Sequence, residues 1–242
     1  MIRFFRTLRQ RLLTENRASK YLLYAMGEIL LVVIGILIAL QVNNWNEGRK
    51  ERVVEREVLH ELKENLERNV SDLQAVMERG RRFNSSRNLV YKALENNAPY
   101  HDSLTEHFLF AGMGISKPSI SRSGYEMLQN EGFEIITSSS LRTHIVQLFE
   151  KTYANYDEKL STTNITPLVE DMTRYFRTHF KRMDDPYRRV PLDYPRLLGD
   201  NYLIESLKAI AYWEDFLLQD NAMSLEETQK VLQLINQALD AE

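Results

Sequence analysis

The stretch YLLYAMGEILLVVIGILIALQVNNWNE, residues 21–47, decides how this chain is organised. Its part from Tyr21 to Val42 has 22 residues, and Glu28 carries the only ionisable acid or base among them apart from the tyrosines. At 1.5 Å per residue, a helix of this length is about 33 Å long and covers a hydrocarbon core of about 30 Å. The sequence therefore predicts a transmembrane helix over residues 21–43.

A cleaved secretory signal is the alternative interpretation of this stretch. The uninterrupted apolar part, Ile29–Leu40, has only 12 residues and follows a basic region, as in signal sequences. However, the segment IALQVNNWNE that closes the stretch offers no small-x-small cleavage site. We therefore expect an uncleaved anchor.

The distribution of Lys and Arg predicts the orientation of the anchor. Six such residues precede the apolar stretch, and four follow it closely, at positions 49, 50, 52 and 56. Because the more basic flank stays inside, we expect a cytoplasmic amino terminus, a periplasmic body and Trp45 at the outer interface. The formal net charge of −3, with the basic excess at the amino end, argues against nucleic acid as a partner of the body.

Residues 1–20 predict a basic amphipathic segment on the cytoplasmic side. Phe5, Leu8 and Leu12 share one helical stripe, and arginines occupy the other positions. Such a helix lies on an anionic inner leaflet, with the lipid-contacting side chains Arg3, Arg6, Arg9 and Arg11. The alternative is a flank that only sets the topology.

The run from FFRTLRQRLLTEN through SKYLLYAMGEILLVVIGILIALQVNNWNE resembles the amino-terminal signature of an uncharacterised family of small single-span membrane proteins common in Bacteroidota. That family is known only as a domain of unknown function. The resemblance is close over about residues 1–60, and further on it is confined to the neighbourhood of SGYEMLQNEGFEII and LRTHIVQLFEKTY. It implies a bacterial inner membrane and a periplasmic body, and it supplies no activity and no catalytic residue.

One face of the predicted membrane helix is polar and small. Tyr24, Glu28, Gly35 and Ala39 fall on one stripe because they are separated by four, seven and four residues. The pair Gly35-x-x-x-Ala39 allows close approach of a second helix, so we expect association with another copy or with a membrane-protein partner. A Glu facing acyl chains would cost on the order of 2–3 kcal/mol if ionised.

Two interpretations of Glu28 follow. In the first, Glu28 fixes the register of an oligomer through a hydrogen bond to Tyr24 or to a partner helix. In the second, Glu28 carries protons in a conducting assembly, since acids within the membrane mark proton pathways.

Residues 44–242 predict an all-α periplasmic domain. Apolar residues recur every three or four positions after the span, at Leu59, Leu62, Leu66, Leu73 and Val76. Asn69 interrupts this pattern, which favours a helix of about 30 residues in the body's own bundle over a coiled-coil stalk. No alternating run indicates a long strand.

Local signals divide the rest of the body into helices. Ser103 with Glu106, and Ser224 with Glu227, have the spacing of capping boxes at helix starts. Thr166-Pro167 and Asp200 also indicate helix starts, whereas Gly132 indicates a helix end. The segment Phe180–Gly199 is the longest predicted loop.

Motifs for catalysis or for a metal are missing from the sequence. The chain has no Cys, and its five His residues lack the spacing that aims two imidazoles at one metal. No phosphate-binding glycine loop and no nucleophile elbow occur. We therefore expect no enzyme activity, no cofactor and no bound metal.

Two sets of side chains in the body leave alternatives open. Eleven aromatic residues between Tyr153 and Phe216 predict core packing, with an aromatic ligand cleft as the alternative. The basic set consists of Arg81, Arg82, Lys181, Arg182, Arg188 and Arg189. It predicts either paired surface ions or a patch for acidic headgroups or glycans.

Together these observations predict a single-span protein of the bacterial inner membrane whose all-α periplasmic domain acts as a scaffold, sensor or assembly module. The alternative is an ion- or proton-conducting assembly that uses Glu28. Anionic lipid and a membrane-protein or identical partner are the expected contacts.

Overall fold

The computed structural model describes residues 18–162, 165–185 and 187–241. The predicted lipid-surface residues Arg3, Arg6, Arg9 and Arg11 lie outside this range. The chain divides into two compact units, Met1–Val54 and Glu55–Glu242. Helix α2, Ala18–Glu95, begins in the first unit and ends in the second. The predicted membrane boundary at residue 43 stays a prediction.

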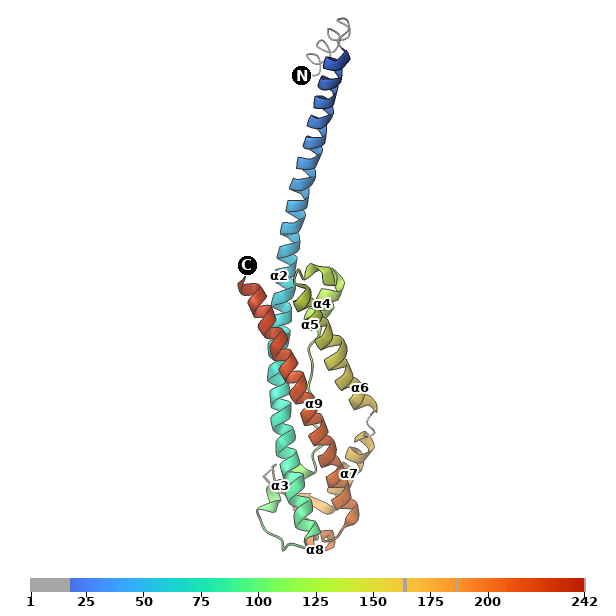
Figure 1. Cartoon of the computed structure of the whole chain (residues 1–242). Coiled ribbons are helices and arrows are strands. Elements are labelled where there is room, and N and C mark those ends of the chain that lie inside the picture. The colour runs from blue at the N-terminus through green and yellow to red at the C-terminus, as the bar shows by residue number, and fades with distance from the viewer. Residues whose placement is uncertain (1–17, 163–164, 186, 242) are drawn as a thin grey trace. The chain divides into compact units, whose positions relative to one another are not determined.

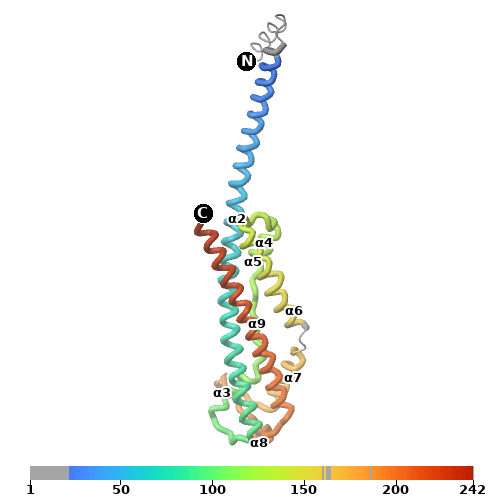
Figure 2. The backbone as a smooth tube through the Cα atoms, viewed as in Figure 1, coloured from blue at the N-terminus to red at the C-terminus, as the bar shows by residue number. Residues whose placement is uncertain are grey.

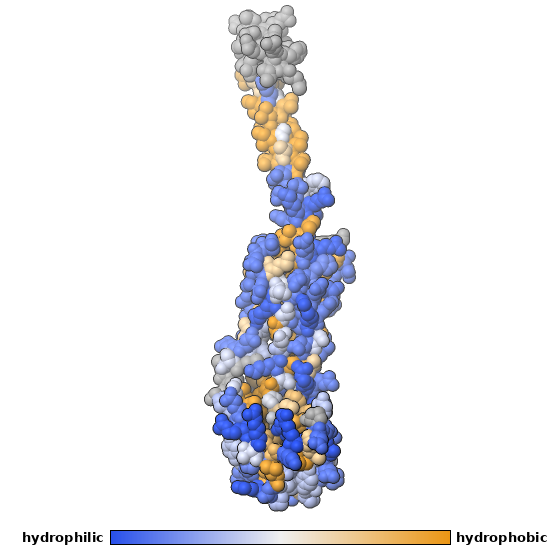
Figure 3. Space-filling model, turned by 180° about the vertical axis from the view of Figure 1, so that it is seen from behind, coloured by the Kyte–Doolittle hydropathy of each residue, from blue (hydrophilic) through white to orange (hydrophobic). Residues whose placement is uncertain are grey.

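The described part of the first unit is one helix, which is apolar in residues 22–42 and polar after them. It contains a window of 18 residues that is long and apolar enough to cross a membrane, and none of that window is buried. Figure 3 shows this stretch as a predominantly hydrophobic band. The large apolar side chains between Leu22 and Val42 are 44–72% exposed. Length and composition therefore make it a candidate membrane span.

Three helical rods form the second unit (Figures 1 and 2). The first rod is α2 from Glu55 onward. The second consists of α5 (Ser139–Gln147), the π-helical η2 (Leu148–Tyr153), α6 (Ala154–Thr162) and α7 (Ile165–His179). The third is α9 (Asn201–Asp240).

Ion pairs and hydrogen bonds define how these rods run. On α2 and α9, Glu95 pairs with Lys208 at 2.8 Å and Arg87 pairs with Glu214 at 3.1 Å. Lys159 of α6 lies 2.9 Å from Asp220 of α9, and the hydroxyl groups of Tyr153 in η2 and Thr228 in α9 are 2.7 Å apart. In both comparisons the residue numbers of α9 rise while those of its neighbour fall, so α9 is antiparallel to both of its neighbours.

An extended segment, residues 113–122, runs back along α2 beside these rods. Its backbone is held at Met113 by Arg87, at Ser119 by Asp72 and at Ser121 by Asn69. The segment is therefore fixed along α2 by side chains of that helix.

Short elements complete the second unit. They are α3 (Leu104–Ala111), α4 (Ser123–Glu131), the 3₁₀ helix η1 (Phe133–Ile135), β1 (Phe180–Arg182), β2 (Arg189–Pro191) and α8 (Tyr194–Leu197). The two strands pair antiparallel, with Phe180 opposite Pro191 and Arg182 opposite Arg189. The all-α prediction is confirmed, except that β1, β2 and α8 lie in the segment predicted as a loop.

The core confirms that the body's first helix belongs to its bundle. Leu59, Leu62, Leu66, Leu73 and Val76 are at most 1% exposed. The aromatic set also fills the core in large part, because Tyr153, Tyr156, Phe176, Phe180 and Tyr194 are buried. Three of its members, Tyr187, Tyr202 and Tyr212, are instead exposed.

Two helix-end predictions are confirmed together with the local chemistry that they assumed. Gly132 ends α4 with a φ of 93°, and the carboxylate of Asp200 accepts a hydrogen bond from the N–H of Leu203 at the start of α9. Both sites use local chemistry that is independent of distant residues.

One of the two predicted capping boxes is wrong. Ser224 lies inside α9, where it is buried, because a capping pattern within a continuous apolar stripe does not start a new helix. The other box marks a helix start correctly, since α3 begins directly after Ser103, but the Ser103 side chain makes no capping bond and lies 2.8 Å from Nδ1 of His101. The start predicted at Thr166-Pro167 agrees within two residues with that of α7, which begins at Ile165.

Gly124 of α4 allows a close approach to the backbone of α2. A Cβ at this position would lie 2.8 Å from the backbone nitrogen of Leu62 on α2 and 2.9 Å from its Cα. Helix backbones cannot move aside as a flexible side chain does, so only glycine permits this approach.

We predict that Gly124→Ala destabilises the protein by about 1–3 kcal/mol, the usual cost of overpacking. Thermal unfolding of the full chain in detergent measures the effect. Gly48→Ala is the matched control, because residue 48 lies in helix α2 and a Cβ there would have no atom within 4 Å. The control should be neutral or slightly stabilising, and an equally tolerant Gly124→Ala would contradict the close packing of α4 on α2.

Candidate functional site

The predicted association residues all lie on the described part of α2. At 100° per residue, Tyr24, Glu28, Gly35 and Ala39 fall within an arc of about 60°. All four are exposed, and no atom lies within 4 Å of a Cβ built on Gly35. Trp45 is 64% exposed on the same helix. The geometry suits a second helix, and the association itself stays a prediction.

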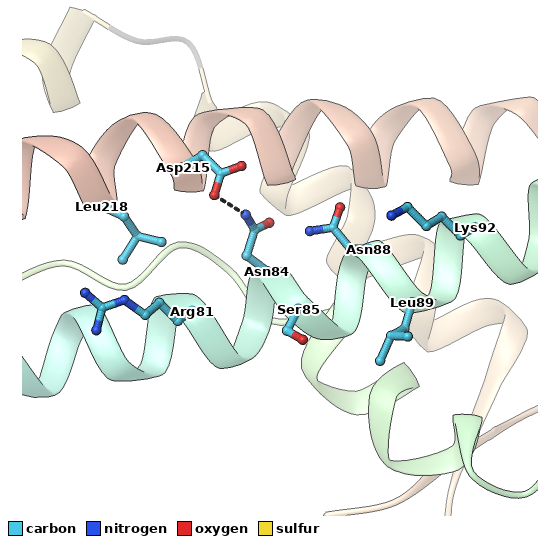
Figure 4. A pocket seen from close by; sticks show the side chains of 8 residues that line it. All are labelled: Arg81, Asn84, Ser85, Asn88, Leu89, Lys92, Asp215 and Leu218. Carbon is cyan, nitrogen blue, oxygen red and sulfur yellow. Dashed lines mark hydrogen bonds between the residues drawn. The ribbon is translucent and has the colours of Figure 1, made fainter.

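A cavity of about 400 Å³ lies between α2 and α9 in the second unit (Figure 4). Its lining residues are Arg81, Asn84, Ser85, Asn88, Leu89 and Lys92 from α2, and Asp215 and Leu218 from α9. The amide Nδ2 of Asn84 donates to Oδ1 of Asp215 at 2.6 Å. This bond ties the two helices together across the cavity.

The groups that line this cavity can offer hydrogen bonds to a polar group. Arg81 and Lys92 are cationic, Ser85 carries a hydroxyl, and Asp215 already accepts a hydrogen bond from Asn84.

Helices α2 and α9 also share a fully buried ion pair. Nη1 of Arg87 donates to Oε2 of Glu214 at 3.1 Å, and the two side chains are 0% and 2% exposed. Nη2 of Arg87 also donates to the carbonyl of Met113 at 2.6 Å and to that of Gly114 at 3.2 Å. One guanidinium thus joins α2, α9 and the extended segment.

Burial governs the protonation of this pair. Loss of hydration raises the pKa of the Glu214 carboxyl above its usual range, and Arg87 offsets this only in part. Burial likewise lowers the pKa of the Arg87 guanidinium. Gly80 makes room for the carboxylate, since a Cβ there would lie 2.5 Å from Oε1 of Glu214. A glycine inside helix α2 is therefore explained by the close approach of Glu214.

Two asparagines of α2 hold the far end of the extended segment. Asn69 donates to the carbonyl of Ser121 at 3.1 Å and accepts from its N–H at 2.7 Å. Oδ1 of Asn65 accepts from the hydroxyl of Ser123 and from the N–H of Gly124. Asn69 therefore breaks the apolar pattern because it binds a backbone within the same chain.

The predicted basic set is split between different places. Arg81 lines the cavity of Figure 4, and Arg82 lies 4.0 Å above the ring of Phe110. Arg182 and Arg189 face each other across the strand pair and share a cavity with Arg177, which the sequence pattern did not single out. None of the six forms an ion pair with a residue that the structure describes. Arg177 lies in a helix outside the basic runs, and only the fold brings it there.

In the described ranges, no group of three or more His, Asp or Glu residues is arranged to hold a metal ion. The expectation that the protein needs no metal and no cofactor stays a prediction.

Comparison with known proteins identifies one family model that matches residues 28–184, described as a family of unknown function (DUF6090). No curated protein and no solved structure matches the chain.

We predict that Arg87→Met destabilises the protein by about 3–5 kcal/mol, because it leaves Glu214 buried without its cation. Chemical denaturation of the full chain in detergent measures the loss. The double variant with Glu214→Leu should recover part of it, since the unpaired carboxylate is gone.

Full recovery is not expected, because the carbonyls of Met113 and Gly114 still lack their donor. The surface pair Arg122–Asp157 provides the control, and Arg122→Met should cost about 1 kcal/mol or less. An Arg87→Met protein as stable as the wild type would contradict this account of the ion pair.

Proposed function

Because the chain belongs to this family of unknown function, whose description supplies no activity, we propose from its own residues that it is a membrane-anchored, non-catalytic binding module. It presents an all-α domain outside the bacterial inner membrane and acts there as a scaffold, sensor or assembly module. One observation carries the proposal, namely the exposed apolar stretch of α2.

The exposure of this stretch supports an anchor more strongly than its composition does. A buried core helix would pass the same test of length, but the side chains of this window are all outside the protein core. Soluble monomers rarely expose continuous apolar patches larger than a few hundred Å². A hydrocarbon environment removes this surface from water, and burial of each apolar side chain stabilises by about 1.5–3 kcal/mol.

The expected orientation follows from the flanking charges. The amino terminus with its arginines stays in the cytoplasm, near anionic lipid, and the body lies in the periplasm. Trp45, on the body side of the stretch, suits the outer interface.

The non-catalytic part of the proposal rests on the polar groups of the body. Its buried polar side chains mostly bind one another or backbone groups, as Arg87, Asn65 and Asn69 do. Such networks position chain segments and specify a fold. A domain built in this way serves to hold a shape to which a partner binds.

Association within the membrane uses the stripe of Tyr24, Glu28, Gly35 and Ala39. Small residues allow two backbones to come close, and the carboxyl group supplies an interhelical hydrogen bond. The expected partner is a second copy or another membrane protein.

A second candidate function is proton conduction, which one observation favours. The carboxyl group of Glu28 is the acid within the exposed apolar stretch, and acids in such positions mark proton pathways. In this case the body would anchor or gate a conducting assembly.

We predict that alkaline phosphatase is active when fused after Glu242 and inactive when fused after Lys20. The enzyme works only in the periplasm, so the pair of fusions reports both sides of the anchor. The reverse pattern, or activity of the carboxyl-terminal fusion in the soluble fraction, would refute the proposed topology.

We predict that Gly35→Leu weakens self-association in detergent, because a large side chain separates the two backbones. Gly27→Leu is the matched control, since residue 27 lies about 90° from the centre of the stripe. Analytical ultracentrifugation measures both variants. A monomeric wild type at high concentration would exclude a homo-oligomer.

Glu28 variants separate the two candidate functions. If Glu28 serves association, Glu28→Gln retains the oligomer and Glu28→Leu weakens it by about 1 kcal/mol. If Glu28 carries protons, reconstituted vesicles of wild type show proton flux, and Glu28→Gln abolishes that flux while leaving the oligomer intact. We expect tolerance of Gln and no flux.

A further inference from the structure

A second polar cavity, of about 430 Å³, lies in the body between α7, the strand pair β1–β2 and the start of the extended segment. Its lining residues are Gly112, Met113, Gly114, Thr173, Phe176, Arg177, Phe180, Arg182 and Arg189. It belongs entirely to the second unit, so inferences about it do not depend on the membrane anchor.

Three arginines converge on this cavity from different elements. Arg177 lies in α7, shortly before β1, and Arg182 and Arg189 come from the two strands. The register places Arg182 directly opposite Arg189, and paired residues project from the same face of a strand pair. The fold therefore gathers three positive charges from three elements at one place.

Such an arrangement is unfavourable for a strand pair of only three residues per strand. Like charges directly opposite each other destabilise the pairing, whereas a pair of opposite charge would stabilise it. A departure from such local rules without a compensating contact is expected at functional sites.

No carboxylate among the described residues compensates these charges through an ion pair. None of the three arginines is paired there, and the buried Nε of Arg189 has no hydrogen-bond partner in the same ranges. Burial lowers the pKa of the Arg189 guanidinium, and the nearby charges of Arg182 and Arg177 lower it further. These observations favour an anion as the partner of the three side chains.

Two aromatic rings form an apolar part of the remaining wall, beside Thr173 and the backbone around Gly112. The rings of Phe176 and Phe180 stack with centroids 4.5 Å apart, and Arg189 lies 6.0 Å from the centre of the Phe176 ring. A Cβ on Gly112 would lie 2.8 Å from that ring, so glycine lets the backbone close over it. Ligand sites combine such apolar walls with a few convergent polar groups, at volumes of about 300–1,000 Å³.

We propose that this cavity binds a phosphate group through Arg177, Arg182 and Arg189. The planar guanidinium forks match tetrahedral oxyanions, and a phosphate monoester carries up to two negative charges against the three positive ones. The cavity also has room for the organic part of a phosphate ester, which would lie against Phe176 and Phe180.

The direct test titrates the full chain in an uncharged detergent with inorganic phosphate at constant ionic strength, by calorimetry. The wild type shows saturable binding. Arg177→Gln and Arg189→Gln each weaken the affinity about tenfold or more, because each removes a charge-assisted contact. Arg174→Gln is the matched control on the same helix: Arg174 pairs with Asp171, does not line the cavity, and should bind phosphate within about twofold of wild type.

A stability measurement keeps the test valid if a variant binds poorly because it is partly unfolded. Without phosphate, Arg182→Gln should unfold at a higher temperature than the wild type, since a like-charge pair is relieved. With saturating phosphate the order should reverse, because only the wild type gains the full stabilisation of the bound anion. Absence of phosphate binding, equal affinity of wild type and Arg177→Gln, or a lower unfolding temperature of Arg182→Gln in both buffers would overturn the proposal.

Two further titrations distinguish the source of the phosphate group. Glycerol 3-phosphate represents a soluble ester, and dihexanoyl phosphatidic acid represents a lipid headgroup in soluble form. Equal affinities would assign the site to soluble phosphate esters. A tenfold preference for the lipid would assign it to a headgroup whose acyl chains contact the aromatic wall.

Discussion

The fold of the body depends on hydrogen-bond partners for the peptide groups of an extended segment that lies in a helical bundle. Residues 113–122 run extended beside α2, and an extended chain cannot pair its own peptide groups as a helix does. Side chains of α2 supply the missing partners: Arg87 at one end, Asp72 in the middle, and Asn69 near the other end. These polar positions of α2 are matched to a neighbouring backbone, which explains why Asn69 and Arg87 are polar although they are buried in a core helix.

Arg87 binds both the extended segment and helix α9. Its guanidinium is buried, so it needs the carboxylate of Glu214, and Glu214 in turn needs the space that Gly80 leaves on α2. The same guanidinium fixes the carbonyls of Met113 and Gly114, which lie on the wall of the arginine-lined cavity. The helix pair and that cavity are thus linked through one side chain.

Much of the architecture could be predicted from local patterns. The apolar stretch, the leucine spacing after Leu59, the stop at Gly132 and the cap at Asp200 each depend on neighbours in the sequence, and these predictions agree with the structure. The predictions that failed concern contacts between distant residues. Ser224 has the spacing of a cap, but tertiary packing continues α9 through it.

In the candidate sites, too, local sequence patterns were predictable and contacts between distant residues were not. Basic residues around position 182 were recognisable in the sequence, whereas the cross-strand pairing of Arg182 with Arg189 and the position of Arg177 beside them could be known only from the fold.

The hydrogen bonds to the extended segment have a consequence for the residues that determine its path. Because side chains of α2 bind its backbone, the path of residues 113–122 depends largely on residues of α2. Its own exposed positions, such as Lys117, are then free to diverge, while a change at Asn69 alters the route of a chain segment some fifty residues away.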